Sequence, residues 1–320
     1  LALSSVEDLT APLKFHEYVF QHWKDGYHHI PTSSSRLEQT MTLFGMDEFL
    51  RILYESPIRG ARWNLTTDGQ SSPATIDHYI QTKLDWTAPP SLSELETLCQ
   101  DGASFVFNEI QQFSRPLAKF CAQTMQIMGE GVNMNAYFSP ANGKRGLGCH
   151  YDIQDHFIIQ FSGSKRWRFY EGLENNPIDK VDFSKSSEQR RPDTKGFTDV
   201  DVNPGDVLYF ARGQWHEPVP LDTHSLHLTL TIPRTFQFQI INWLTRRLRQ
   251  DETFPEFLPD VTEHHPTQQE WKIAAETVRR EAINVLRSPD FCQRAFLDKF
   301  QEAFVYNFDD SHDQDDALKL

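Results

Sequence analysis

Apolar and polar residues alternate along several short runs in the middle of the chain, which is the pattern of strands with one buried face. Residues 132–140 (VNMNAYFSP) and 224–232 (HSLHLTLTI) follow this two-residue repeat, and residues 157–161 form an apolar run. One face of 224–232 is expected to carry Ser225, His227, Thr229 and Thr231. The centre of the chain is therefore predicted to be rich in β-structure.

Helical periodicity appears on either side of these runs. Residues 12–24 place three apolar side chains on one stripe, namely Phe15, Val19 and Trp23. Residues 46–54 indicate another short helix, and Ser114 can cap a longer one. The apolar face of that longer helix is predicted to consist of Leu117, Phe120, Cys121, Thr124 and Met128. We expect helices packed on a sheet.

From residue 234 onward the pattern becomes helical. Thr267 and Glu270 form a capping box in front of an apolar stripe made of Trp271, Ala274, Val278, Ala282 and Val285. We therefore expect a domain at 1–233, a separate helical segment at 234–306 and a disordered acidic tail at 307–320. The apolar stripes need a partner surface, which predicts a homodimer; the alternative is that they pack on their own barrel.

Composition and charge narrow the classes of partner. The chain has 320 residues and a formal net charge of −14, which disfavours non-specific binding to nucleic acid. It lacks an apolar run of about 20 residues, the length that a membrane-spanning helix needs, and a signal-peptide pattern. The four cysteines are widely spaced: Cys99, Cys121, Cys149 and Cys292. These features predict a protein of the reducing cytoplasm.

The candidate chemistry lies in residues 146–170 (GLGCHYDIQDHFIIQFSGSKRWRFY), which contain His150 and Asp152. Two residues apart on a strand, these side chains point the same way and are about 7 Å apart at Cα, so they could grip one metal ion. His216 follows a Pro-Gly-Asp turn and offers a third ligand. Two histidines and one carboxylate form the facial triad of non-haem Fe(II) oxygenases. The alternative is an ordinary His–Asp hydrogen bond and a core histidine.

Residues 171–200 separate the two candidate ligand segments. They are polar and show no periodicity. A long insertion at this place predicts either a disordered loop or a lid over the pocket.

Together these motifs resemble the JmjC oxygenases of the cupin-type ribosomal oxygenase group, from about residue 12 to residue 240. The matching segments are 132–140, 146–170, 203–216 (NPGDVLYFARGQWH) and 224–232, together with an N-terminal helix and strand. The resemblance implies a mainly β fold with helical additions, a double-stranded β-helix of the cupin/JmjC jelly-roll type, followed by the helical C-terminal segment.

The resemblance also implies roles for single residues. The Fe(II) ligands would be His150, Asp152 and His216. Lys165 would pair with the distal carboxylate of 2-oxoglutarate, with Arg166 in reserve if Lys165 points outward. The remaining cosubstrate contacts would come from Tyr137, Thr229 and Asn135, of which Asn135 could instead face the substrate.

The implied function is an Fe(II)- and 2-oxoglutarate-dependent dioxygenase that uses O2 to hydroxylate an amino-acid side chain in a protein, such as a ribosomal protein, or in a peptide. The basic loop ANGKRG (141–146) and the short stretch left for a C-terminal winged helix depart from the family pattern. Both departures concern substrate choice. The alternatives are a hydroxylase that tailors a peptide natural product and a non-catalytic cupin scaffold; a demethylase is disfavoured because no methyl-ammonium pocket is indicated.

Overall fold

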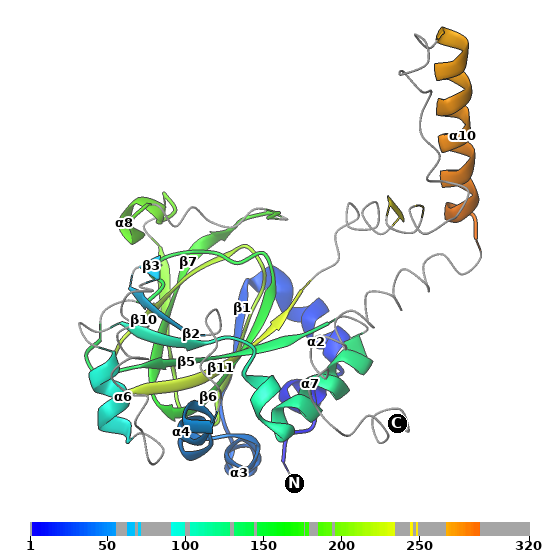
Figure 1. Cartoon of the computed structure of the whole chain (residues 1–320). Coiled ribbons are helices and arrows are strands. Elements are labelled where there is room, and N and C mark those ends of the chain that lie inside the picture. Colours follow the sequence, from blue (N-terminus) through cyan, green and yellow to red (C-terminus); the bar gives the residue numbers. More distant parts are fainter. Residues whose placement is uncertain are drawn as a thin grey trace. The chain divides into compact units, whose positions relative to one another are not determined.

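A computed structural model describes residues 2–55, 63–67, 70–71, 91–99, 103–128, 131–143, 146–175, 177–178, 185–193, 196–233, 244–245, 248 and 267–288. The chain divides into two compact units, one formed by Leu1–Pro233 with Asn307–Leu320 and the other by Arg234–Tyr306. The first unit contains both β-sheets (Figure 1).

The large sheet has eight strands in the order β1-β9-β6-β11-β5-β4-β2-β3, and every pairing in it is antiparallel. Its strands are β1 (Tyr27–Ile30), β9 (Val207–Phe210), β6 (Asp155–Gly163), β11 (Ser225–Ile232), β5 (Asn133–Ser139), β4 (Ser104–Phe107), β2 (Trp63–Thr67) and β3 (Gln70–Ser71). The small sheet, β10-β7-β8, consists of β10 (Gln214–Val219), β7 (Lys165–Leu173) and β8 (Phe197–Val202). Two antiparallel sheets of this kind form the jelly roll expected from the sequence.

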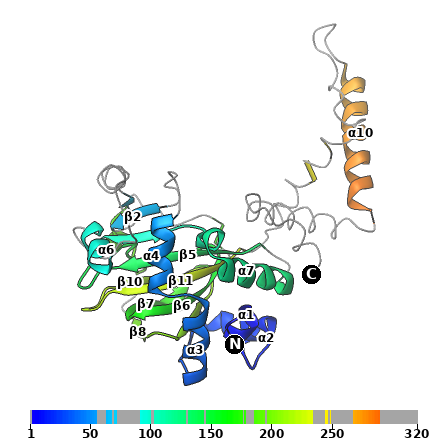
Figure 2. The same ribbon diagram turned by 60° about the horizontal axis from the view of Figure 1, so that its bottom comes forward.

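Most of the helices belong to the first unit. They are α1 (Val6–Thr10), α2 (Phe15–His22), η1 (Trp23–Asp25), α3 (Ser34–Leu43), α4 (Met46–Glu55), α6 (Leu92–Leu98), η3 (Ile110–Phe113), α7 (Arg115–Met128) and α8 (Ser187–Arg190). In a view from below, α1 and α2 lie beside α7 (Figure 2), and α7 also contacts β5.

Strand β6 shows how the alternating sequence builds two layers. Phe157 and Phe161 point outward, where they meet Phe15 of α2 and Phe44 at the end of α3. Ile158, on the opposite face, joins the core between the sheets. That core also contains Trp167, Phe169, Val202, Leu208 and Phe210. The helices therefore cover the outer face of the large sheet, and the inner face is left for the site.

The small sheet separates its two faces by charge. Arg166 and Arg168 of β7 pair on the exposed face with Asp201 and Asp199 of β8. Lys165, by contrast, is buried with 3% of its surface exposed. Lys165 therefore points inward, and Arg166 points away from the core.

Most predicted elements are confirmed, with three corrections. Trp23 is 39% exposed, because the helix that carries Phe15 and Val19 ends at His22 and Tyr18 is buried in place of Trp23. In α7 the buried face includes Met125 in place of the predicted Met128, which lies about one turn further along the helix. Residues 197–202, predicted to lack regular structure, form β8 because they pair with β7.

The second unit is described mainly by helix α10 (Gln268–Leu286). Its predicted capping box is confirmed, since Thr267 and Glu270 satisfy each other's backbone N–H groups. No residue of α10 is buried, and Trp271 is 45% exposed. Most of the remaining helical pattern predicted from residue 234 onward falls outside the described residues.

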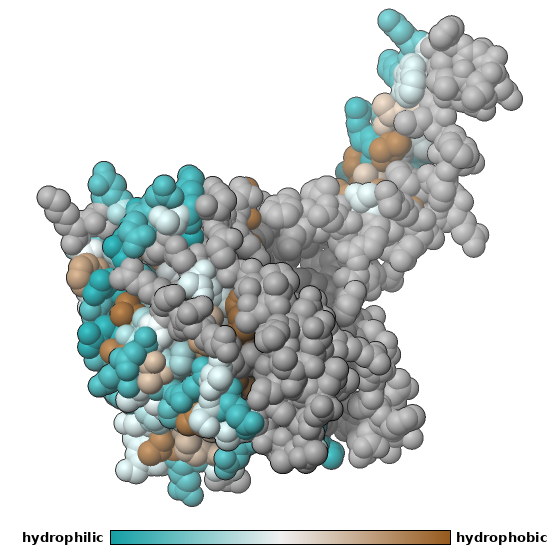
Figure 3. Space-filling model, turned by 60° about the vertical axis from the view of Figure 1, so that its left-hand side comes forward, coloured by the Kyte–Doolittle hydropathy of each residue, from teal (hydrophilic) through white to brown (hydrophobic). Residues whose placement is uncertain are grey.

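The surface of the described chain is predominantly hydrophilic on the face that Figure 3 shows, with hydrophobic residues scattered in small groups. No helix within the described ranges is both long enough and apolar enough to cross a bilayer.

Candidate metal centre

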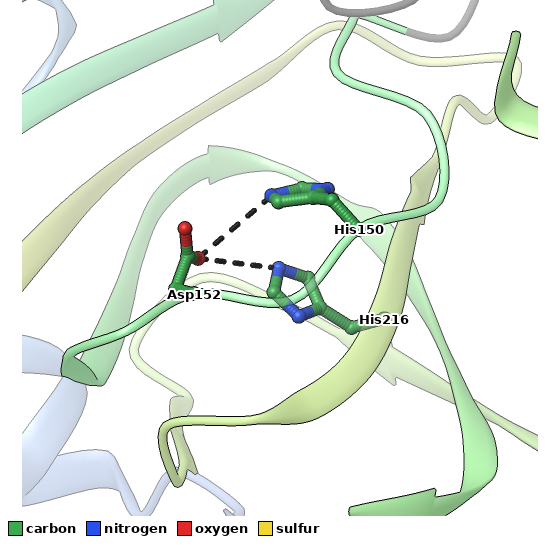
Figure 4. A group of neighbouring side chains, drawn as sticks. All are labelled: His150, Asp152 and His216. Atoms are coloured by element: carbon green, nitrogen blue, oxygen red, sulfur yellow. Dashed lines mark ion pairs between the residues drawn. The ribbon is translucent and has the colours of Figure 1, made fainter. Parts of the chain in front are cut away.

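Two segments that are distant in the sequence meet at the open end of the barrel. His150 and His216 exchange both backbone hydrogen bonds, at 2.9 and 2.8 Å, in an isolated antiparallel bridge. Asp152 lies two residues beyond His150, and both imidazole rings point toward its carboxylate (Figure 4). The ligand atoms of His150, Asp152 and His216 lie within 4.8 Å of one another. The three predicted ligands are therefore brought together.

The local backbone differs from the prediction in one respect. His150 and Asp152 were expected on a regular strand, but they lie in an irregular extended segment that precedes β6. His216, expected after a β-rich run, is itself inside β10. The convergence comes from the bridge between the two histidines and not from one continuous strand.

Hydrogen bonds fix how the two imidazole rings present their nitrogens. His150 Nδ1 lies 2.9 Å from the carbonyl oxygen of Gly148, and His216 Nδ1 lies 2.9 Å from that of Gln214. Because a carbonyl only accepts, each Nδ1 must carry the proton, so in the neutral ring each Nε2 presents a lone pair. These Nε2 atoms lie 3.8 and 3.7 Å from Asp152 Oδ2.

The pKa shifts of the three residues favour neutral histidines and a charged carboxylate, the forms that bind a cation. Burial lowers the pKa of His150, and it lowers that of His216 to about 3. Burial alone would raise the pKa of Asp152, but the imidazoles of His156, His150 and His216 hold it well below its usual range. Two neutral imidazoles and one carboxylate then converge, with lone pairs facing lone pairs at distances too long for hydrogen bonds. A divalent metal ion fits this arrangement, and two histidines with one carboxylate suit iron.

A cavity of about 330 Å³ opens beside the three residues. It lies between the two sheets, with walls formed by β5, β6, β7, β10 and β11. All seven residues predicted for the site line it, namely Asn135, Tyr137, His150, Asp152, Lys165, His216 and Thr229. The alternation predicted for 224–232 is confirmed for three of its four residues, because His227, Thr229 and Thr231 line this cavity, whereas Ser225 does not.

Lys165 provides a buried positive charge inside this cavity. Its Nζ donates to Ser139 Oγ at 2.6 Å, and Ser139 Oγ lies 2.9 Å from Ser104 Oγ. Burial lowers the pKa of Lys165 to about 8. An ammonium group in such a place can pair with an anionic ligand.

The other polar walls are held in place by their neighbours. The side-chain oxygen of Asn135 accepts the backbone N–H of Glu109 at 2.9 Å. The ring of Tyr137 stacks on that of His227, with 5.1 Å between the ring centroids. Burial raises the pKa of Tyr137 to about 12, which keeps its hydroxyl protonated. Thr229 pairs with Asn135 across β5 and β11.

His156 is a residue of this cavity that the sequence reasoning missed. It is buried on β6, and its Nε2 lies 3.3 Å from Asp152 Oδ2. Its Nδ1 lies 3.3 Å from Thr231 Oγ1. The alternation of β6 carried the signal, because residue 156 shares the inward parity of Ile158.

Comparison with known proteins connects this geometry to a family. Residues 108–239, which include all seven of these residues, match the model described as a JmjC domain. This segment of the chain is therefore similar to a JmjC domain. A bifunctional lysine-specific demethylase and histidyl-hydroxylase NO66 from Dictyostelium discoideum is 36% identical over 133 residues, which cover 41% of this chain and 26% of that protein. Ribosomal oxygenase 2 from Bos taurus is 32% identical over 179 residues, covering 54% of this chain and 33% of the relative.

Solved structures share the fold of this chain. The X-ray structure of E. coli ycfD superposes with a TM-score of 0.56 at 17% identity, covering 89% of this chain and 70% of ycfD. The structure of YcfD, a ribosomal oxygenase from Escherichia coli, in complex with cobalt and 2-oxoglutarate superposes with a TM-score of 0.51 at 17% identity, covering 89% of this chain and 70% of YcfD. At this identity the likeness concerns the fold. The chain spans about a quarter to a third of the length of the two curated relatives named above.

Proposed function

We propose that this chain is an Fe(II)- and 2-oxoglutarate-dependent dioxygenase that hydroxylates an amino-acid side chain of a protein, with a ribosomal protein as the first substrate class to test. The observation that carries the proposal is that one cavity holds both three candidate metal ligands and a buried lysine whose described polar contact is a hydroxyl group. The named relatives, a bifunctional lysine-specific demethylase and histidyl-hydroxylase and a ribosomal oxygenase, support a protein side chain as the substrate class.

Each part of the cavity then has a task. His150, Asp152 and His216 would hold the iron and leave positions open on it. The Lys165 ammonium would bind the distal carboxylate of 2-oxoglutarate, and the hydroxyls of Tyr137 and Thr229 would complete that pocket. Asn135 is held by Glu109 and would line the same wall. An iron held there would supply oxidative chemistry in which O2 is the oxidant: conversion of 2-oxoglutarate to succinate and CO2 would provide two electrons, and hydroxylation of the substrate C–H bond would provide the other two.

The protein itself contributes order and exclusion of water. The histidines are locked by their Nδ1 hydrogen bonds, so little reorganisation is needed when the metal binds. Ile158, Trp167 and Phe210 give the cavity an apolar wall, which would exclude water around a bound ligand. A dry site strengthens the contact between Lys165 and a carboxylate.

Anaerobic titration of the apo protein with Fe(II) and 2-oxoglutarate tests the proposal. We expect the weak visible charge-transfer band of the chelate in the wild type, no band in His216→Ala, and a need for far more 2-oxoglutarate in Lys165→Ala. A folded wild type that shows no band would contradict the proposal and favour a non-catalytic scaffold. The substrate class is then tested by incubating the active enzyme with ribosomal proteins and measuring the mass gain of one oxygen atom.

We further propose that the protein acts in the cytoplasm as a homodimer. The uncovered stripe of α10 supports the dimer, because Trp271 and Val278 expose 45% and 43% of their surface. The three described cysteines, Cys99, Cys121 and Cys149, are buried and in the thiol form, which supports a reducing compartment.

A further inference from the structure

Two consecutive arginines, Arg190 and Arg191, end the short helix α8 in the connection between β7 and β8. Each of them reaches a segment that carries one of the metal-site histidines. Neither lines the cavity described above. The two arginines therefore contact the segments that carry the histidines and do not contact the interior of the cavity.

Arg190 binds the segment just before His150. Its side chain is buried, with 4% of the residue exposed, and its guanidinium donates from Nε to the Cys149 carbonyl at 2.7 Å and from Nη2 to the Leu147 carbonyl at 2.8 Å. Nη1 donates to the carbonyl of Lys185, within the α8 connection itself. One planar group thus ties the connection to two carbonyls of the histidine segment.

The carbonyl between these two is the one that orients the metal-site ring. Gly148 accepts the Nδ1 proton of His150, and it has a positive φ of +66°. This turn directs the Gly148 carbonyl to the ring and its two neighbours, Leu147 and Cys149, to Arg190. Fixing the neighbours fixes the acceptor that sets the tautomer of His150.

Arg191 acts on the other histidine segment through a carboxylate. Its Nη2 lies 3.2 Å from Glu217 Oε2, and the same oxygen accepts the hydroxyl proton of Tyr170 at 2.7 Å. Glu217 is fully buried and directly follows His216. Because a buried carboxylate needs its partners, this contact resists movement of the β10 backbone at His216.

We propose that Arg190 and Arg191 are positioning residues that brace the His150 and His216 segments from the outside, so that the β7–β8 connection sets the metal affinity of the site. This inference rests on the proposed function, since it assigns the two histidines to a metal. It makes the described residues 185–193 of the connection a fixed support. The sequence of residues 171–200 predicted a lid over the pocket as one alternative. A lid would contact the substrate, whereas a support contacts the histidine segments.

The test is Co(II) binding to the full chain, followed by its visible absorption, with Arg190→Met, Arg190→Lys and Arg191→Met. Loss of an outer contact to a metal ligand commonly weakens binding about 10- to 100-fold, and we expect a Kd increase in this range for Arg190→Met and at its lower end for Arg191→Met. Arg190→Lys keeps the positive charge but loses the planar guanidinium that donates to two carbonyls at once. We therefore expect its Co(II) affinity to remain weak. Arg168→Met is the matched control, because Arg168 pairs with Asp199 on the exposed face.

A second readout separates positioning from simple stabilisation. The thermal midpoint of each variant is measured with and without saturating Co(II), because a ligand stabilises in proportion to the logarithm of its affinity. Positioning predicts a smaller Co(II)-induced shift than in wild type. A lower midpoint with an unchanged shift, a Kd within about twofold of wild type, or full recovery in Arg190→Lys would overturn the inference.

The outcomes for the two proposals are distinguishable. A wild type that binds no Co(II) would overturn the proposed function and this inference together. A wild type that binds Co(II), with variants that bind it equally well, would overturn the brace alone. If Arg190→Met does not fold, Arg190→Lys and Arg191→Met decide the matter.

Discussion

Lys165 is a buried cation whose described polar contact is a hydroxyl group, that of Ser139. Burial lowers its pKa to about 8, and the lysine in turn lowers the pKa of the buried His227 beside it, which burial has already lowered. A bound carboxylate would offset the unfavourable free energy of burying the Lys165 charge, because a nearby negative charge favours the ammonium form. The binding of an acidic ligand and the protonation of Lys165 should therefore be coupled.

This coupling predicts how 2-oxoglutarate affinity depends on pH. Below about pH 8 Lys165 is charged and binding is strongest; above it the neutral amine prevails and Kd should rise about tenfold for each pH unit. Lys165→Met should weaken binding by about 1.5–3 kcal/mol, the usual contribution of a hydrogen bond to a charged group, and should remove this pH dependence. Calorimetric titration of the Fe(II)-loaded protein between pH 6.5 and about pH 9.5 measures both effects. A wild-type Kd that stays constant through pH 8 would contradict the coupling.

At the scale of single residues, the sequence predicted which candidate ligands come together, but not every contact around them. His150, Asp152 and His216 stand in recognisable patterns and their side chains converge, although the backbone at His150 and Asp152 is irregular and not a strand. Arg190 could not be found in this way, because its partners are backbone carbonyls 41 and 43 residues away in the chain. A backbone carbonyl has no residue type, so no motif marks such a contact.

At the scale of elements, the strands with clear alternation were predictable and the irregular connections were not. β5, β6 and β11 follow their sequence pattern, whereas β8 is recognised only through its pairing with β7. The junction of β6 and β7 is a further example. It turns at Gly163, whose φ is +59°, beside a register shift between β6 and β11.

Gly163 gives a prediction about this junction. In Gly163→Ala the new Cβ would meet the backbone carbonyl of His224, in a conformation that L-residues rarely adopt. We expect a loss of about 1–3 kcal/mol in the free energy of unfolding, measured by urea denaturation. Gly45→Ala is the control, since nothing lies within 4 Å of its added Cβ. Equal midpoints for the two variants would show that the turn tolerates a side chain.

At the scale of the whole molecule, the barrel and the C-terminal helix present opposite cases. The barrel buries its apolar faces between its sheets and under its helices, while α10 buries none of its residues. The sequence predicted both the capping box and the apolar stripe of α10. It could not identify the surface that covers the stripe, since any apolar surface of suitable shape would serve.

The proposed dimer predicts the effect of charge on this stripe. The double variant Trp271→Glu and Val278→Glu places two carboxylates on the uncovered face, and we expect it to be monomeric by light scattering where the wild type is dimeric. Ile273→Glu is the control, because Ile273 is 57% exposed and points to another side of the helix. A monomeric wild type would rule out the dimer.

The backbone bridge between His150 and His216 should affect two rates, those of amide hydrogen exchange and of metal uptake. Two residues that exchange both of their hydrogen bonds hold their Cα atoms about 5.5 Å apart whether or not an ion is present. The amide protons of these two histidines should therefore exchange slowly with deuterium even in the apo protein, although both lie outside the central strands of the large sheet. Metal uptake would then proceed at the rate at which the ion sheds water, since no folding step has to come first.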